Sequence, residues 1–308
     1  MFFLYLKSLV FAVVVMFFAA GVFNYIVDPL NYVRANTNSY YSSERNLKMR
    51  MANENKYDGL IVGSSKPSYI KTNEIGKPNS ILNASFSAAL PEEILYFLMS
   101  RDSGEKWVAI GLDWYMFHEK KFPYEDDSMI SSAGDIAKYL MSAKTIFYSM
   151  STVYKRMLNR PYAYSVDGSR YITKIQDCSN DENTLKSTQN EEYKAVMDML
   201  SDRFVDFSIS KRRLLILSDI KQWGENSGVK IVWWINPYHE DVLNLLKSYH
   251  NAEINMLPDM IKNIVGDVID LSEAYPDRCN YWADDPYHYL PSVGNRMMLN
   301  NVLPEIKK

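Results

Sequence analysis

The sequence predicts an α/β fold in which helices cover both faces of a parallel sheet. Three observations predict this fold, an N-terminal membrane helix and an insertion. Short, fully apolar runs that suit buried parallel strands alternate with longer stretches of helical pattern. An uncharged apolar run near the N-terminus predicts a transmembrane helix. Residues 118–206 break the alternation and predict a mostly helical and irregular insertion.

The apolar run near the N-terminus fits a membrane anchor. Leu9–Val27 carries no charge, Lys7 precedes it and Asp28 follows it. Its roughly 19 residues, at about 1.5 Å each in a helix, nearly cross a bilayer core of ~30 Å. A cleaved signal peptide is less favoured, because Phe18-Ala19-Ala20 is a poor cleavage site, and a buried core helix is the third alternative.

This anchor predicts where the protein is located. Lys7 and the free amino group favour a cytoplasmic N-terminus. We therefore expect an anchor over residues 1–28 in the inner (cytoplasmic) membrane. The single domain that follows, over residues 29–308, is then periplasmic or extracellular.

Composition limits the partners and cofactors. A net charge of −3 gives no electrostatic argument for binding nucleic acid. The 23 tyrosines and six tryptophans suit partly wet surfaces such as sugar-binding grooves, although many will be core. Cys178 and Cys279 match no metal-binding spacing, so we expect no metal and no cofactor. They form either one disulfide or two unpaired thiols.

The elements of the sheet follow in order along the chain. After a polar stretch over residues 28–56, expected to be irregular, the predicted strands are Gly59–Gly63, Trp107–Leu112, Val229–Ile235 and Val268–Leu271. The predicted helices are Pro91–Arg101, Ile136–Leu158, Ser208–Glu225, His239–Tyr249 and Pro291–Ile306. Pro91 followed by two glutamates is a typical first helical turn. The polar segment Tyr162–Asn190 lies within the insertion, which we interpret as a lid or substrate-binding subdomain.

The first apolar run leads directly into Gly63-Ser64-Ser65-Lys66. A hydroxyl at this strand end lies on a tight turn, and a following helix would direct its N-terminal N–H groups towards whatever the hydroxyl attacks. A serine becomes a nucleophile only with a base in reach. Asp285-Pro286-Tyr287-His288 offers one, so the two segments together predict a serine acyl-transfer site.

These segments resemble the outer motifs of the SGNH (GDSL-like) hydrolase superfamily. Gly63-Ser64-Ser65 takes the place of the family's G-D-S, and Asp285 and His288 match its D-x-x-H. The resemblance implies a three-layer, flavodoxin-like sheet and a catalytic triad of Ser65, His288 and Asp285. His288 would take the Ser65 proton while Asp285 orients the imidazole. From the sequence alone, Asp284 is an alternative to Asp285.

The middle motifs of the family match less well. Asn83–Ala88 resembles N-x-S-x-S-G, with Ala88 in the place of the glycine whose N–H helps to form the oxyanion hole. The resemblance thus implies oxyanion donors at the backbone of Ser65 and Ala88. The family's G-x-N becomes Gly111-Leu112-Asp113, and an ionised Asp113 cannot donate a hydrogen bond. We therefore expect Asp113 to have turned away, another donor to replace it, or the site to be slow.

A narrower resemblance concerns substrate and partners. The anchor, the Val-Asp-Pro segment after it, G-S-S for G-D-S and Asn236-Pro237-Tyr238-His239 resemble membrane-anchored SGNH-like proteins that accompany cell-surface polysaccharide machinery. This implies an O-acetyltransferase or esterase acting on an extracytoplasmic glycan, with a membrane-bound O-acyltransferase as a possible partner. The alternative is a catalytically inactive scaffold that binds glycan or recruits that enzyme. Possible substrate contacts are Ser64, Asp113 and His239.

Overall fold

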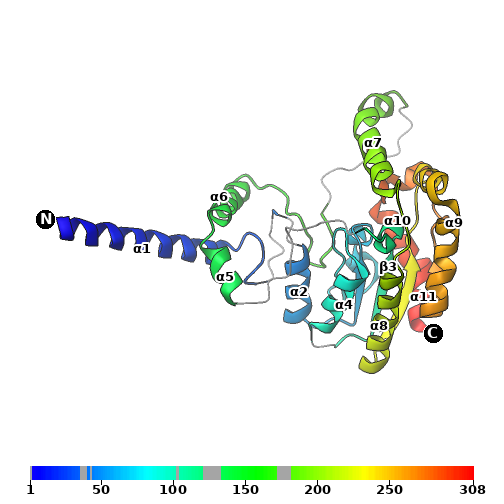
Figure 1. Ribbon diagram of the computed structural model, residues 1–308, viewed down its shortest axis with the longest axis horizontal. Helices are drawn as coiled ribbons and strands as arrows, with labels where there is room; N and C mark the ends of the chain where they lie inside the picture. Colours follow the sequence, from blue (N-terminus) through cyan, green and yellow to red (C-terminus); the bar gives the residue numbers. More distant parts are fainter. Residues whose placement is uncertain (1, 35–39, 42–43, 102–103, 121–132, 172–181) are drawn as a thin grey trace.

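The computed structural model describes residues 2–34, 40–41, 44–101, 104–120, 133–171 and 182–308. An α/β body forms most of it, and the N-terminal helix α1 (Phe2–Val27) projects from this body (Figure 1). Nearly all of the apolar side chains of α1 are exposed. Over Phe3–Val27 the helix is long and apolar enough to cross a membrane, as the sequence predicts.

The body contains a sheet of five parallel strands. They are β1 (Gly59–Gly63), β2 (Ile81–Asn83), β3 (Trp107–Leu112), β4 (Lys230–Ile235) and β5 (Val268–Asp270). Their order is β2-β1-β3-β4-β5, which is one of the two common orders of doubly wound sheets. The four predicted strands are confirmed. The edge strand β2 was not predicted.

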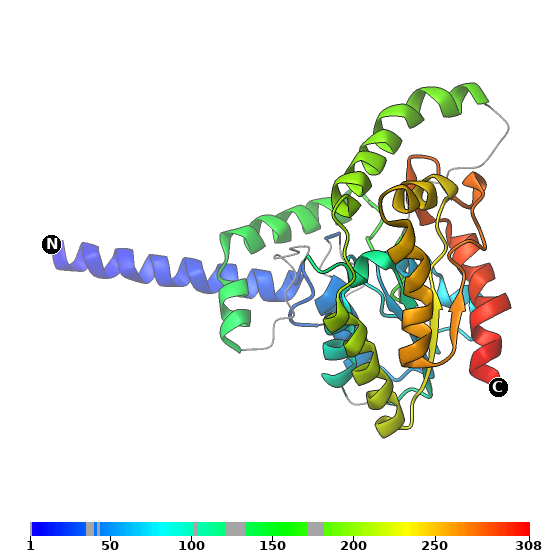
Figure 2. The ribbon, with the colours of Figure 1, turned by 45° about the vertical axis from the view of Figure 1, so that its right-hand side comes forward.

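Helices cover both faces of this sheet, which confirms the predicted three layers (Figures 1 and 2). Alternate side chains of each strand enter two separate cores: Val108 and Ile110 point to one, Ala109 to the other. The first core is closed by α2 (Glu44–Glu54), α4 (Pro91–Met99), α8 (Lys211–Ser227) and α9 (Glu240–Val265). The second is closed by α3 (Thr72–Ile75), α10 (Pro291–Met297), the π-helical turn η4 (Met298–Val302) and α11 (Leu303–Lys307).

Several predicted helices differ from those observed. Helix α2 lies in a segment predicted to be irregular. It was missed because most of its buried side chains are polar, so the sequence shows no apolar period there. Helix α9 continues beyond Tyr249 to Val265, through a non-helical residue at His250. The helix predicted over Pro291–Ile306 is interrupted by the π-helical turn.

The insertion holds three helices in the described residues. The helix predicted over Ile136–Leu158 is two, α5 (Ala133–Leu140) and α6 (Ala143–Met157), which lie beside the end of α1 (Figures 1 and 2). Helix α7 (Glu182–Phe204) begins inside the polar segment and was not predicted.

The C-terminal region adds an antiparallel hairpin that the sequence did not predict. It consists of β6 (Tyr281–Trp282) and β7 (Asp285–Tyr289), and α7 packs against β7. Just before it, Cys279 is part of a disulfide. Cys178 lies outside the described residues.

Candidate active site

Ser65 lies at the carboxyl edge of the sheet, two residues beyond β1. The turn that carries it is tight: a Cβ on Gly63 would lie 2.7 Å from the carbonyl oxygen of Gly111 on β3. Only glycine allows this approach. The expected helix after the serine is wrong, since a three-residue 3-10 turn, η1 (Pro67–Tyr69), follows instead. Helix-dipole assistance is therefore small here.

The structure brings together the three residues of the predicted triad. Ser65 Oγ lies 2.7 Å from His288 Nε2, and His288 Nδ1 lies 2.6 Å from Asp285 Oδ2. Because a carboxylate can only accept at Nδ1, the Nδ1–H tautomer leaves Nε2 to accept the serine proton. Asp285, rather than Asp284, is thus the partner of the imidazole.

The Asp285 carboxylate is held in its charged form. Burial would raise the pKa of this carboxyl, but attraction to the His288 ring and hydrogen bonds from that ring and from the Tyr287 and His288 backbone N–H groups outweigh burial and lower it. The His288 ring also meets Tyr69 and Tyr287 edge-on, at 5.5 and 5.2 Å between ring centroids. These contacts fix the orientation of the imidazole.

Two of the residues that line the pocket are those predicted to supply the oxyanion donors. Ser65 and Ala88 both line the pocket above the triad, and neither N–H has an acceptor within the described part of the chain. Ala88 has φ of 50°, in the left-handed region that favours glycine. The alanine therefore keeps the backbone conformation of a glycine turn while adding a methyl group. The adjacent Ser87 N–H already donates to the buried Glu44 carboxylate.

Asp113 is not at the oxyanion position. Its side chain is fully buried and does not line the pocket. The carboxylate accepts hydrogen bonds from the hydroxyls of Ser64 and Tyr238 and from the amide of Asn236. Of the three sequence alternatives for Asp113, the structure shows the side chain turned away.

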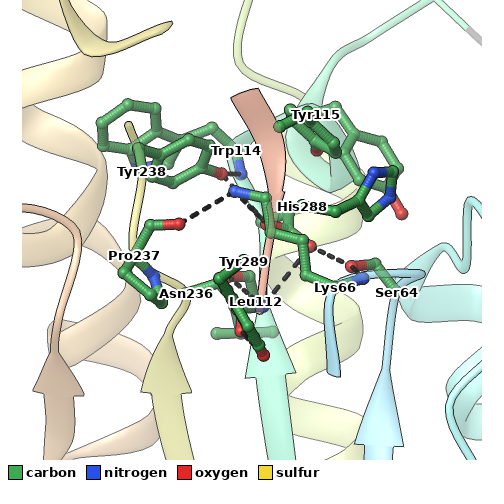
Figure 3. A network of polar contacts seen from close by, with 12 residues as sticks. Ser64, Lys66, Leu112, Trp114, Tyr115, Asn236, Pro237, Tyr238, His288 and Tyr289 are labelled. Carbon is green, nitrogen blue, oxygen red and sulfur yellow. Dashed lines mark hydrogen bonds and ion pairs between the residues drawn. The ribbon is translucent and has the colours of Figure 1, made fainter. Parts of the chain in front are cut away.

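Lys66 forms the centre of this buried polar layer (Figure 3). Its Nζ lies 3.3 Å from Asp113 Oδ1 and donates to the carbonyl oxygen of Pro237 at 3.1 Å. The ammonium also stacks on the rings of Tyr238 and Tyr287, 3.2 and 4.3 Å from their centroids. Burial lowers the pKa of Lys66 to about 8, although the Asp113 charge opposes the shift. The lysine thus ties together the segments that follow β1, β3 and β4 with strand β7.

The three possible substrate contacts lie beneath or beside the pocket. Ser64 and Asp113 belong to the buried layer, and neither lines the pocket. His239 is buried at the start of α9, where its Nδ1 accepts from the Asp241 N–H at 3.0 Å. It is therefore the N-cap of a helix and does not reach the pocket either.

The pocket over Ser65 has a volume of about 290 Å³. Helix α7 supplies a largely apolar wall with Val196, Met199, Leu200 and Phe204. Two arginines, Arg170 and Arg203, also line it. Arg170 pairs with Glu44 at 2.7 Å and donates to Ser87 at 2.6 Å, so it also supports the turn that carries Ala88.

Sequence reasoning missed Lys66, Arg170 and the α7 wall. Lys66 was visible as a lysine directly after the motif, but nothing in the sequence indicated its burial. No cluster of metal-ligating side chains occurs among the described residues. No family model and no curated protein matches this chain. The geometry of the site is therefore the basis for a functional proposal.

Proposed function

We propose that this protein is a membrane-anchored serine acyltransferase or esterase of the SGNH type, acting on a cell-surface polysaccharide outside the cytoplasm. The observation that carries the proposal is the hydrogen-bonded chain from Ser65 Oγ through His288 to Asp285, at 2.7 and 2.6 Å. The anchoring and sidedness rest on the apolar helix α1 and on Lys7 before its uncharged part. The choice of a glycan as substrate rests on the resemblance of the motifs. So does the choice of a membrane-bound O-acyltransferase as the partner that brings the acyl group across the bilayer.

The reaction would proceed in two acyl transfers. Ser65 Oγ attacks the acyl carbonyl carbon while its proton passes to His288 Nε2, and Asp285 stabilises the resulting imidazolium. The oxyanion would be held by the Ser65 and Ala88 N–H groups. The leaving oxygen takes the proton from His288, which leaves an acyl-Ser65 ester. Water or a sugar hydroxyl then attacks this ester with His288 again as base, and the product is the free acid or the acylated glycan.

Asp113 motivates the alternative of an inactive scaffold. Its negative charge would oppose an oxyanion only if it faced the reacting oxygen, but its oxygens are bound by Ser64, Lys66, Asn236 and Tyr238 below the pocket. This arrangement favours the enzyme over the scaffold.

Covalent labelling with a fluorophosphonate tests the proposal on the purified full-length chain. We expect labelling of the wild-type protein and complete loss of labelling in Ser65→Ala. The matched control is Ser248→Ala on α9, whose exposed hydroxyl donates to the carbonyl oxygen of Leu245. This control should label like the wild type. A wild-type protein that is never labelled would support the scaffold instead.

A further inference from the structure

Helix α6 has its polarity reversed relative to a helix of a water-soluble body. Its buried side chains are Thr145, Ser149 and Thr152. Its exposed side chains include a stripe on the opposite side, namely Phe147, Met150, Tyr154, Met157 and Leu158. Helix α8 shows the ordinary arrangement, with Leu214, Leu217 and Ile220 buried. Phe147 is 67% and Met157 is 77% exposed, so nothing in the described chain covers this stripe.

The polar side of α6 packs against the last turns of α1 (Figure 2). The hydroxyl of Ser149 donates to Asn24 Oδ1 at 2.8 Å, and Asn24 Nδ2 donates to the carbonyl oxygen of Leu140 at 2.7 Å. Met141, at the corner between α5 and α6, lies against Gly21. Small and hydroxyl-bearing residues between helices, with apolar residues facing outwards, are typical of helices that pack within lipid.

The length of α1 places this contact in the bilayer. Lys7 is the charged residue of α1 and marks its cytoplasmic end in the proposed orientation. From Ser8 to Val27 the helix rises about 30 Å, the thickness of the hydrocarbon core. Gly21 and Asn24 then lie in the outer leaflet. The residues of α5 and α6 that contact them lie at the same depth.

The charges of α6 agree with this location. The helix and the turn after it contain no acidic residue, but they carry Lys144, Lys155, Arg156 and Arg160. Basic residues beside an apolar stripe are favoured where anionic headgroups meet acyl chains. A protein partner would need no such excess of one sign.

We propose that α5 and α6 form a second membrane-contacting element, in which the apolar stripe of α6 rests in the lipid of the outer leaflet. This rests on the anchoring by α1 that forms part of the proposed function, but not on the serine chemistry. Met141, just before α6, contacts Gly21 of α1, and Ser149, further along α6, contacts Asn24, which is nearer to the outer end of α1. The helix therefore rises out of the membrane towards its C-terminal end, and Phe147 lies deeper than Met157.

Depth-dependent quenching tests this on the full-length protein. The single variants Val14→Cys, Phe147→Cys, Met157→Cys and Leu215→Cys are labelled with an environment-sensitive fluorophore in the absence of reductant. The parent protein is treated in parallel as the blank. Each is reconstituted into phosphatidylcholine–phosphatidylglycerol vesicles with or without a lipid that carries a nitroxide on the acyl chain near the headgroup. Leu215 is the matched control, because it is 64% exposed and belongs to α8, which lies away from α1 (Figure 1).

We expect loss of fluorescence at Val14 and Phe147, a smaller loss at Met157 and none at Leu215. The two α6 positions are about 15 Å apart along the helix, so a gradient between them is measurable. Loss at Val14 with neither α6 position differing from Leu215 would overturn the proposal and leave the anchor intact. This is also the result expected if α6 docks onto a protein, since none is present. No loss at Val14 would overturn the anchor as well. None of these outcomes depends on whether Ser65 reacts.

Discussion

The carboxyl edge of the sheet carries two layers of polar side chains that differ in exposure and in hydrogen bonding. The pocket lining holds Ser65, Asp285 and His288, all partly exposed, and the Ser65 N–H has no acceptor within the described residues. The layer beneath it holds Ser64, Lys66 and Asp113, all fully buried, with the charges bound to one another and to neutral donors and acceptors. A reactive group must be accessible to substrate and must have hydrogen-bonding capacity left for it. A buried charge is stable only when water is excluded and all its hydrogen bonds are made within the protein.

One turn supplies both layers. In the turn after β1, Ser65 is partly exposed and lines the pocket, whereas its neighbours Ser64 and Lys66 are fully buried. Each layer also has its own carboxylate, Asp285 above and Asp113 below. Substitution of these two aspartates therefore separates catalysis from stability.

The largest effect is expected from Asp285→Asn. An amide at this position can hold the imidazole in the wrong tautomer, so we expect acyl transfer or fluorophosphonate labelling to slow by roughly 10⁴-fold, as in serine proteases. The free energy of unfolding should fall modestly at neutral pH, because the amide loses the contribution of the charged carboxylate. The lowered pKa of Asp285 contributes stability above the ordinary carboxyl pKa, and this contribution disappears as pH falls through the lowered value. Labelling rates and urea unfolding of the same preparation measure both quantities. An unchanged labelling rate would remove Asp285 from the mechanism.

Asp113→Asn should give the opposite result. It leaves the fully buried Lys66 without its counter-charge, which costs about 3–5 kcal/mol in the free energy of unfolding. The folded fraction should still react with the fluorophosphonate, because Asp113 does not line the pocket. Urea denaturation checks the first statement and labelling of the folded protein checks the second.

The double variant Lys66→Met/Asp113→Asn sharpens the same contrast. Removing both charges should restore most of the stability lost in Asp113→Asn, since a buried pair often contributes little net free energy. If the double variant is instead as unstable as the sum of the two single variants, the two residues act independently and the buried layer is not held by their pairing.

The elements predicted from the sequence were those whose patterns are local. The four predicted strands were found from short apolar runs, which burial on both faces leaves in the central strands β1, β3 and β4. Helix α6 was found as part of one long helix, yet nothing local indicated the break at Met141, where the side chain lies against Gly21 of α1. Strand β7 was missed because Asp285–Tyr289 mixes charged, proline and aromatic residues. Asp285 and His288 of this strand belong to the candidate site, and they do not form an apolar strand pattern.

The candidate site divides in the same way. Ser65, His288 and Asp285 could be chosen from the resemblance of their motifs to a known family, and the structure adds that Asp285 rather than Asp284 meets the ring. The burial of Lys66 could not be predicted, because its partners Asp113, Pro237 and Tyr238 come from distant segments. The α7 wall depends on a helix that begins in a polar stretch with no apolar period.

The smallest predicted effect is a pH dependence of stability that comes from the buried layer alone. Burial lowers the pKa of Lys66 from 10.5 to about 8, so between these values the unfolded chain binds a proton that the folded protein releases. The free energy of unfolding should therefore rise with pH in this window, by about 1–2 kcal/mol between pH 8 and 9.5.

Urea unfolding at these two pH values, compared between wild type and Lys66→Met/Asp113→Asn, measures this rise. The difference between the two proteins isolates Lys66, because Lys48, whose pKa burial also lowers to about 8, titrates in both and cancels. Lys106→Met is the matched control: its exposed ammonium pairs with Asp58, its pKa is raised, and it stays charged throughout. Equal pH slopes in wild type and the double variant would mean that Lys66 is not the buried cation of this layer. A steeper rise of the free energy of unfolding in the wild type would assign the titration to Lys66 in the buried layer and not to the triad above it.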